Sequence, residues 1–143
     1  MRESKTKVFL SYAREDKAKV RSIYTRLSGA GLAPWMDIED LAPGEVWESS
    51  IKKAIRYADF FLAFLSRNSV NKRGFLQKEI KNALDTWQEK LNSDIYIIPV
   101  RLDECDLPED LHAFQRVDLF EKGSFTRLLK SLQERFPPAT SVA

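Results

Sequence analysis

A chain of 143 residues, 43% hydrophobic and 31% charged, has the size and composition of a soluble globular domain with one core. Its formal net charge of +2, with Lys and Arg scattered among Asp and Glu, gives no reason to expect a nucleic-acid partner. The single cysteine, Cys105, excludes an internal disulfide, and no Cys/His pairing exists for zinc, so we expect no metal site. Because no long apolar segment follows the N-terminus, we expect no signal peptide, no membrane partner and a cytoplasmic location.

Strands and helices alternate along the chain about five times. Short apolar runs predict the strands, and apolar positions three and four residues apart predict the helices. In chain order we expect a strand at Lys7–Tyr12, a helix from Glu15 to about Gly29, a strand at Leu32–Met36, a helix at Val46–Tyr57, a strand at Phe60–Leu65, a helix beginning near Phe75, a strand at Ile95–Val100, a strand near Gln115–Asp118 and a helix at Ser124–Phe136. Residues 137–143 begin with two prolines and are expected to form a disordered tail.

Two residues indicate how individual elements sit in the fold. Pro34 lies inside the second expected strand and cannot donate a ladder hydrogen bond, which predicts an edge strand. Trp47 lies on the apolar face of the next helix and is expected to pack that helix against the sheet. Three polar segments are expected to be loops, namely the acidic segment Asp37–Glu45 with its Pro43-Gly44 turn, the segment from Ser66 to Gly74 and the acidic segment Arg101–Asp110.

The alternation predicts a parallel sheet with helices on both faces. The run Phe60–Leu65 has no polar alternation, which is typical of a central strand that is buried on both faces. Right-handed crossovers then give a three-layer, flavodoxin-like α/β fold whose five parallel strands have the order 2-1-3-4-5. The topological switch point of this strand order lies between the first and third strands. Residues 11–13 and Ser66, at the ends of these strands, should therefore face each other across one cleft.

The sequence lacks several common functional motifs. No Gly-x-Gly-x-x-Gly or Walker loop is present, so the usual phosphate cradles are absent. A response-regulator receiver needs acidic residues where this chain has Ser11-Tyr12 and Leu65-Ser66. The only histidine, His112, lies in a late loop and is expected to be a surface residue. Cys105 has acidic neighbours that should raise the pKa of its thiol, which makes it a poor nucleophile.

Four segments, in their order along the chain, resemble the Toll/interleukin-1 receptor (TIR) domain family. They are Val8–Asp16, which is similar to the first box of the family; Trp35–Asp37 with Asp40–Glu45, which resemble its second strand and "BB loop"; Ala58–Ser66 with Asn68-Ser69 and Phe75–Ile80, which resemble its third strand and third helix; and Ile97–Asp103, which matches its fourth strand. The resemblance extends from about Lys7 to Phe136, and we expect residues 1–136 to form one TIR domain. The combination is more similar to bacterial TIR proteins and the enzymatic animal type than to receptor adaptors.

This resemblance implies NAD⁺ glycohydrolase activity in immune or cell-death signalling, such as antiphage defence. The nicotinamide–ribose bond is cleaved to give nicotinamide and ADP-ribose or a cyclic isomer, so NAD⁺ is the substrate and no cofactor is expected. The residue that matches the family's catalytic glutamate is Glu79. One carboxylate suffices because nicotinamide in NAD⁺ already carries positive charge, and only the oxocarbenium-like ribose needs stabilisation. From helical spacing alone, Glu79 falls at the border of an apolar stripe, and a solvated surface glutamate is the alternative.

Further residues are candidates for substrate binding, and each has a plain structural alternative such as loop capping, burial of an aromatic ring or closure of a turn. Phe75 stands where many relatives carry Trp, which weakens the expected stacking. The candidates are Ser11, Tyr12, Ala13 and Arg14 for the pyrophosphate; Trp35 and Phe75 for stacking; Asp37, Ser66 and Ser69 for ribose; and Pro43, Gly44 and Trp47 in the BB loop and the helix after it.

The resemblance also implies self-association with other TIR domains through the loop Asp37–Glu45, because in the family this loop of one subunit completes a neighbour's site. The same loop serves an alternative function, a non-catalytic module that only binds other TIR domains. A third hypothesis is a nucleoside deoxyribosyltransferase, which shares this type of sheet and a glutamate.

Overall fold

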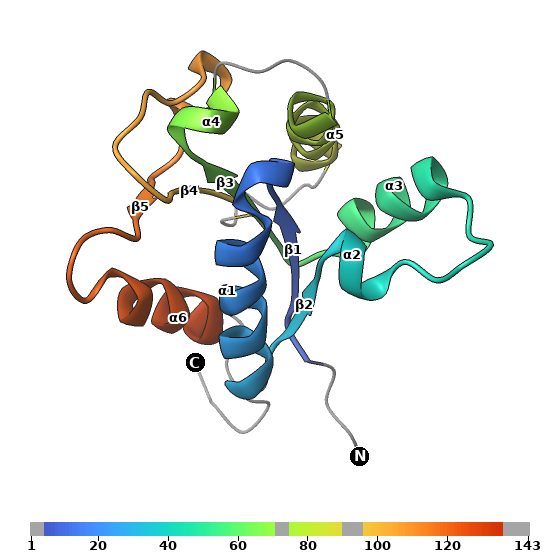
Figure 1. The fold of residues 1–143 in the computed structure, drawn as a ribbon, viewed down its shortest axis with the longest axis horizontal. Helices are drawn as coiled ribbons and strands as arrows, with labels where there is room; N and C mark the ends of the chain where they lie inside the picture. Colours follow the sequence, from blue (N-terminus) through green and yellow to red (C-terminus); the bar gives the residue numbers. More distant parts are fainter. Residues whose placement is uncertain (1–4, 71–74, 90–95, 136–143) are drawn as a thin grey trace.

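The computed structural model describes residues 5–70, 75–89 and 96–135, and within them one sheet forms the centre of the molecule (Figure 1). Its five strands are all parallel and have the order β2-β1-β3-β4-β5. They are β1 (Lys7–Ser11), β2 (Ala33–Trp35), β3 (Phe60–Leu65), β4 (Ile97–Arg101) and β5 (Val117–Asp118). The predicted sheet order is confirmed, and so is the edge position of the strand that contains Pro34.

Helices connect the strands in the expected alternation. They are α1 (Lys17–Gly29), α2 (Asp37–Asp40), α3 (Trp47–Tyr57), α4 (Arg67–Val70), α5 (Phe75–Glu89) and α6 (Ser124–Arg135), with single 3₁₀ turns η1 (Arg14–Asp16) and η2 (Glu109–Leu111). The strand β4 does not include Tyr96, which was predicted to belong to it, and β5 is half the predicted length.

The central strand β3 divides its side chains between the two faces of the sheet, because side chains alternate along a strand. All six of its residues are buried. Phe60, Leu62 and Phe64 pack with α1 and α6, whereas Phe61, Ala63 and Leu65 pack with α3 and α5. Figure 1 shows these two pairs of helices on opposite sides of the sheet. The continuous apolar run thus reflects burial on both faces, as predicted.

Three aromatic rings form a row across the face that α3 and α5 cover. Phe9 of β1 stacks on Trp35 of β2, with ring centroids 5.0 Å apart, and on Phe61 of β3, with centroids 5.2 Å apart. The parallel register pairs Phe9 with both residues, so the stacking follows directly from strand pairing. Offset stacks of this kind add to the energy of area burial.

Two of the expected loops contain a short helix, which the sequence analysis missed. In the segment Asp37–Glu45, the side chain of Asp40 accepts a hydrogen bond from the Met36 amide at 2.8 Å and closes α2. After β3, the Ser66 carbonyl accepts the amides of Ser69 and Val70, both at 3.0 Å, and closes α4. Helices of four residues are too short to show a 3.6-residue periodicity, and their polar residues are also typical of turns.

One further expectation is wrong, and four others lie outside the described residues. Trp47 was expected to pack α3 against the sheet, but 48% of its surface is exposed, and Ile51 and Ile55 make that contact instead. Trp47 is the first residue of α3, so its side chain leaves the helix beyond the end of the packed face. The expectations for Asn71, Gly74, Ile95 and the segment 136–143 lie outside the described residues.

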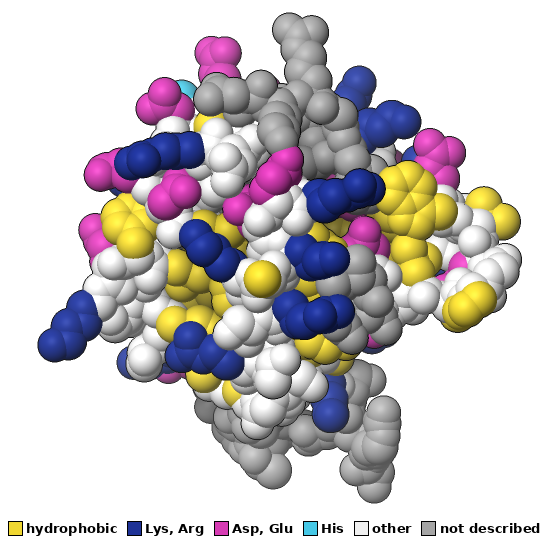
Figure 2. Space-filling view, viewed as in Figure 1, with side chains coloured by type: hydrophobic (Ala, Val, Ile, Leu, Met, Phe, Trp, Pro, Cys, Tyr) yellow, Lys and Arg dark blue, Asp and Glu magenta, His cyan; other side chains and the backbone are white. Residues whose placement is uncertain are grey.

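The basic residues are less evenly scattered than the sequence suggests. The helix α1 has four exposed basic residues, Lys17, Lys19, Arg21 and Arg26, and no acidic residue. Figure 2 shows Lys and Arg side chains gathered over the middle of the face along which α1 runs in Figure 1. The small net charge therefore conceals a local excess of positive charge on one helix.

The fold depends on tight packing around β3, and Phe61 tests this directly. Phe61 is 0% exposed and lies at the end of the aromatic row. We expect Phe61→Ala to lower the free energy of unfolding by about 3–5 kcal/mol, because it removes a fully buried ring and leaves a cavity. Urea unfolding followed by circular dichroism measures the change. A loss below about 1 kcal/mol would contradict the described packing.

Candidate active site

Residues from three elements meet at the carboxyl edge of the sheet, beside β1. Ser11 ends β1 and Tyr12 follows it, whereas Asp37 begins α2 directly after β2. Because β1 and β2 are parallel neighbours, their carboxyl ends lie at the same edge. The third element is α5, which packs near the end of β1 and carries Glu79 in its first half.

The side chain of Glu79 points toward the sheet and away from water. Only 3% of Glu79 is exposed, and its helix neighbours Ile80 and Ala83 belong to the core under α5. The hydroxyl of Ser11 donates a hydrogen bond to its carboxylate. Ser11 reaches this side because it lies two residues after Phe9, which faces the same core. The alternative of a solvated surface glutamate is therefore wrong.

The surroundings of Glu79 hold its carboxyl group in an unusual protonation state. Burial raises the pKa of Glu79 from 4.5 to about 8, because the charged form loses its hydration. The hydrogen bond from Ser11 opposes this rise, and the negative charge of Asp37 adds to it. Near neutral pH the group is therefore mostly protonated, and it ionises only a little above neutrality. Shifts of this kind are typical of functional sites.

A second pair lies next to the first. The hydroxyl of Tyr12 donates a hydrogen bond to Asp37, which is partly exposed. Burial raises the pKa of Tyr12 above its usual range, and the hydrogen bond and charge of Asp37 and the charge of Glu79 raise it further, with Arg21 opposing. Tyr12 is therefore a neutral donor at any physiological pH. Two consecutive residues of the chain, Ser11 and Tyr12, thus hold two carboxylates.

The end of β3 carries a separate hydrogen-bonded group, which is structural. The Ser66 hydroxyl donates to the buried carboxylate of Asp16 at 2.7 Å, and the Ser66 amide donates to the Ser69 hydroxyl at 2.8 Å. The Ser69 hydroxyl donates in turn to the Ser66 carbonyl at 3.1 Å. The bond between Ser66 and Asp16 joins the turn after β1 to the turn after β3. Ser66 and Ser69 therefore close the turn, and their predicted role in ribose binding stays a prediction.

Asp16 was not among the candidates. It lies at the start of the helix predicted from Glu15, but it is 3% exposed and its side chain makes no capping hydrogen bond. Its partner, Ser66, lies 50 residues away in the sequence. No local pattern reveals such a pair, and the only sequence signal is an acidic residue shortly after a buried strand.

The other candidates are spread over a wider region. Trp35 is half-buried and stacks on Phe9, so one of its faces is already occupied. Ala13 is partly buried beside the core under α5, and Arg14 is exposed. Pro43 and Gly44 are exposed in the connection from α2 to α3, which extends beyond the end of α3 in Figure 1. Phe75 begins α5, but its side chain lies outside what the structure describes.

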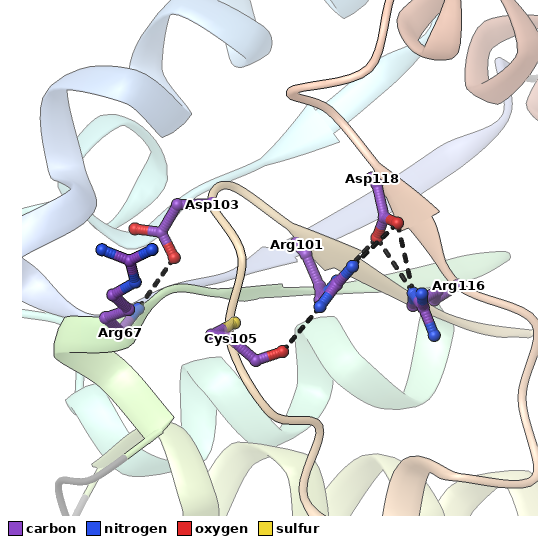
Figure 3. A network of polar contacts seen from close by, with 6 residues as sticks. All are labelled: Arg67, Arg101, Asp103, Cys105, Arg116 and Asp118. Carbon is purple, nitrogen blue, oxygen red and sulfur yellow. Dashed lines mark hydrogen bonds and ion pairs between the residues drawn. The ribbon is translucent and has the colours of Figure 1, made fainter.

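A cavity of about 810 Å³ lies beside β4 and β5, and none of the candidate residues lines it. Its central group is Arg101, which binds both carboxylate oxygens of Asp118, at 2.7 and 2.9 Å, and the Cys105 carbonyl at 2.7 Å (Figure 3). Arg116 binds the same carboxylate at 3.0 Å. The hydrogen bond from Arg101, with a further one from Arg116, lowers the pKa of Asp118 against the effect of burial. This network links the ends of two strands and is engaged in holding the fold.

Two other residues that border this cavity were excluded as catalytic groups. Burial, with the charge of Asp103 as the next cause, raises the pKa of the Cys105 thiol, which therefore stays protonated, as predicted. His112 is exposed, and its Nε2 lies 2.9 Å from the Leu107 carbonyl. The protonated thiol of Cys105 is a poor nucleophile.

Comparison with known families identifies the domain type. The sequence model described as "TIR domain" matches residues 8–132, which is most of the chain. The chain belongs to the TIR domain family. No curated protein sequence gives a significant match.

Solved structures have a similar fold. The chain is similar to the TIR domain of the Toll-related receptor TRR-2 from Hydra magnipapillata, with 22% identity, a TM-score of 0.72 and coverage of 87% of this chain and 96% of that one. It is also similar to the TIR domains of the activated Roq1 resistosome, with 21% identity, a TM-score of 0.61 and coverage of 91% and 82%. A third structure, the CMP N-glycosidase BcmB from Clostridium botulinum, has 18% identity, a TM-score of 0.56 and coverage of 87% and 98%.

Within the described part of the TIR domain, no helix has the length and apolar character needed to cross a membrane.

The buried carboxyl group makes stability depend on pH. The raised pKa of Glu79 means that the native state keeps a proton that the unfolded chain releases, so this group lowers stability as pH rises from about 4.5 to about 8. We expect Glu79→Gln to raise the free energy of unfolding by about 1–3 kcal/mol at pH 9. At pH 5 we expect a smaller increase, because Glu79 is protonated in the native state at that pH. Urea unfolding at both pH values measures the two differences.

The matched control for this experiment is Glu89→Gln, which changes an exposed glutamate of the same helix that pairs with Arg56 at the surface. We expect the difference between this control and the unmodified protein to be similar at pH 5 and pH 9. If the gain in stability from Glu79→Gln is no larger at pH 9 than at pH 5, the result contradicts the buried, protonated state of Glu79.

Proposed function

We propose that this TIR domain is an NAD⁺ glycohydrolase that cleaves the nicotinamide–ribose bond and acts in immune or cell-death signalling. The observation that carries the proposal is the burial of Glu79 at the carboxyl edge of the sheet, hydrogen-bonded to Ser11 at the end of β1. Ligands of open parallel sheets bind at this edge. An N-glycosidase, the CMP N-glycosidase BcmB, also has a similar fold.

The chemistry needs one carboxylate. The bond between ribose C1′ and the nicotinamide nitrogen breaks, its electron pair neutralises the pyridinium ring, and nicotinamide leaves uncharged. The positive charge that develops on C1′ and the ring oxygen is stabilised by the carboxylate of Glu79, at a place where little water screens the interaction. Water then adds to C1′ and loses a proton, or a group of the ADP-ribose itself adds to give a cyclic isomer.

Only the ionised form of Glu79 stabilises this charge. Because the pKa of Glu79 is raised to about 8, the rate of cleavage rises with pH through that region in the isolated domain. Bound NAD⁺ brings its own positive charge into the site, and this charge favours the ionised form of Glu79.

The Glu79→Gln variant tests the assignment of the catalytic residue. Glutamine keeps the shape of the side chain and loses its negative charge, so we expect nicotinamide release to fall about 100- to 1,000-fold. Chromatographic measurement of nicotinamide at pH 9 and high protein concentration gives the rate. Glu89→Gln, on the exposed side of the same helix, should retain full activity. Equal NAD⁺ turnover by Glu79→Gln and the unmodified protein would refute the assignment.

A second candidate function is a non-catalytic module that binds other TIR domains. It is favoured by the exposed apolar surface next to the loop Asp37–Glu45, where Val46 is 69% exposed and Trp47 is 48% exposed. Figure 2 shows hydrophobic side chains at the edge of the molecule where the connection to α3 lies. If clustered protein does not turn over NAD⁺ at any pH, that result favours the non-catalytic module. Base exchange between supplied deoxynucleosides would favour the deoxyribosyltransferase hypothesis instead.

Both functions include self-association through this surface, which is tested by removing its apolar side chains. We expect the double substitution Val46→Ser/Trp47→Ser to weaken self-association about tenfold, because it removes exposed apolar area at the contact. Sedimentation velocity over a range of protein concentrations measures it. Tyr57→Ser is the control, because Tyr57 is 61% exposed at the other end of α3. Weaker association of the control alone would place the contact elsewhere.

A further inference from the structure

Ser11 places a hydroxyl group in an otherwise apolar part of the core. On the face of β1 that α3 and α5 cover, it follows Phe9, and its register partner on β3 is Ala63. Ser11 is 1% exposed, so its hydroxyl has little contact with water. A buried hydroxyl without a partner costs free energy, and this one donates its hydrogen bond to Oε1 of Glu79. The position of Ser11 on the strand thus directs its hydroxyl to one carboxyl group.

The two oxygens of the Glu79 carboxyl group have different surroundings. Oε1 accepts the hydrogen bond from Ser11. Within the part of the chain that the structure describes, Oε2 makes no hydrogen bond. Oε2 is also not enclosed, because among the described residues only Ser124 has a side-chain oxygen or nitrogen that is fully buried without a partner. One oxygen is therefore held, and the other is open at the edge of the sheet where ligands bind.

The hydrogen bond to Oε1 orients the whole carboxyl group. The last torsion angle of a glutamate side chain, χ3, has broad energy wells, so packing around the carbon atoms does not fix the plane of the carboxyl group. Ser11 fixes this plane from a strand that is itself paired with β2 and β3. Because a displacement of about 1 Å at a reacting group can lower a rate about 100-fold, this orientation matters for any reaction at Oε2.

The charged groups near Glu79 do not supply the same orientation. Asp37 of α2 is the charged residue that changes the pKa of Glu79, and its charge disfavours the ionised form. Tyr12 donates its hydrogen bond to Asp37 and not to Glu79. Lys78, the preceding residue of α5, is exposed and forms an ion pair with α3. Among the described residues, Ser11 is therefore the one that binds the Glu79 carboxyl group.

We propose that Ser11 is a positioning residue for Glu79: its hydroxyl holds Oε1 and thereby directs Oε2 toward the ribose of the substrate. Ser11 then acts through Glu79, whereas the sequence analysis predicted a contact between Ser11 and the pyrophosphate. The inference rests on the proposed function for the identity of the substrate. The effect of Ser11 on Glu79 is measured without any reaction.

The first test is a ¹³C NMR titration of the glutamate side-chain carboxyl carbons, with the Glu79 signal assigned by its loss in Glu79→Gln. Because the bond from Ser11 lowers the pKa of Glu79, we expect Ser11→Ala to raise the midpoint by about 0.5–1 pH unit. Ser66→Ala is the matched control, because it removes a buried hydroxyl at the same edge of the sheet that binds Asp16 instead. It should leave the Glu79 midpoint unchanged.

Circular dichroism confirms that both variants are folded. An unchanged Glu79 midpoint in Ser11→Ala, or an equal shift in Ser66→Ala, overturns the inference.

Steady-state kinetics with NAD⁺ separate positioning from substrate binding. At a pH above the rising limb of the rate, we expect Ser11→Ala to lower kcat about tenfold and to change KM less than about twofold. The rising limb should move to higher pH by the same amount as the NMR midpoint. A raised KM with unchanged kcat would assign Ser11 to substrate binding and overturn the inference.

A double-mutant cycle shows whether Ser11 acts through Glu79. In the Glu79→Gln background we expect Ser11→Ala to cause no further fall in kcat. A second tenfold fall in that background contradicts the inference, because Ser11 would then act independently. If the unmodified protein leaves NAD⁺ intact at every pH, the proposed function fails, and the titration alone decides whether Ser11 acts on Glu79.

Discussion

The burial of one carboxyl group beside the end of β1 is the constraint on which the rest of the site depends. Glu79 occupies a position on α5 where Ile80 and Ala83 contribute to the core, so an acid stands in a place suited to an apolar residue. Its retention there lowers stability as pH rises from about 4.5 to about 8, because the native state keeps a proton that the unfolded chain releases. Destabilised groups of this kind are common at functional sites, where the local rules of folding give way to chemistry.

The sheet explains why the site forms where it does. Parallel pairing brings the ends of β1 and β2 together, and the alternation of side chains along β1 turns Ser11 toward α5. The stacked rings of Trp35, Phe9 and Phe61 hold the three strands in this register. The Asp16–Ser66 bond joins the turns after β1 and β3.

The fold was predictable because its signals are local and strong. The apolar run of β3, the proline of β2 and the helical spacing of α1, α3 and α6 each indicate one structure. What the sequence does not reveal depends on contacts between distant residues. Ser11 meets Glu79 across 68 positions and Tyr12 meets Asp37 across 25, and no periodicity encodes such pairs. The prominence of Glu79 came from the family resemblance, whereas its burial and raised pKa became visible only in three dimensions. Trp47 shows the opposite error, because an apolar residue at the first turn of a helix can extend beyond the face that packs.

The central claim is that this site breaks the bond between nicotinamide and ribose, and the most direct test is mass analysis of the products formed from NAD⁺ at pH 9 by concentrated protein. The account predicts nicotinamide together with an equal amount of ADP-ribose, linear or cyclic. Intact NAD⁺ under these conditions, or cleavage of the pyrophosphate with nicotinamide still attached to ribose, would contradict it.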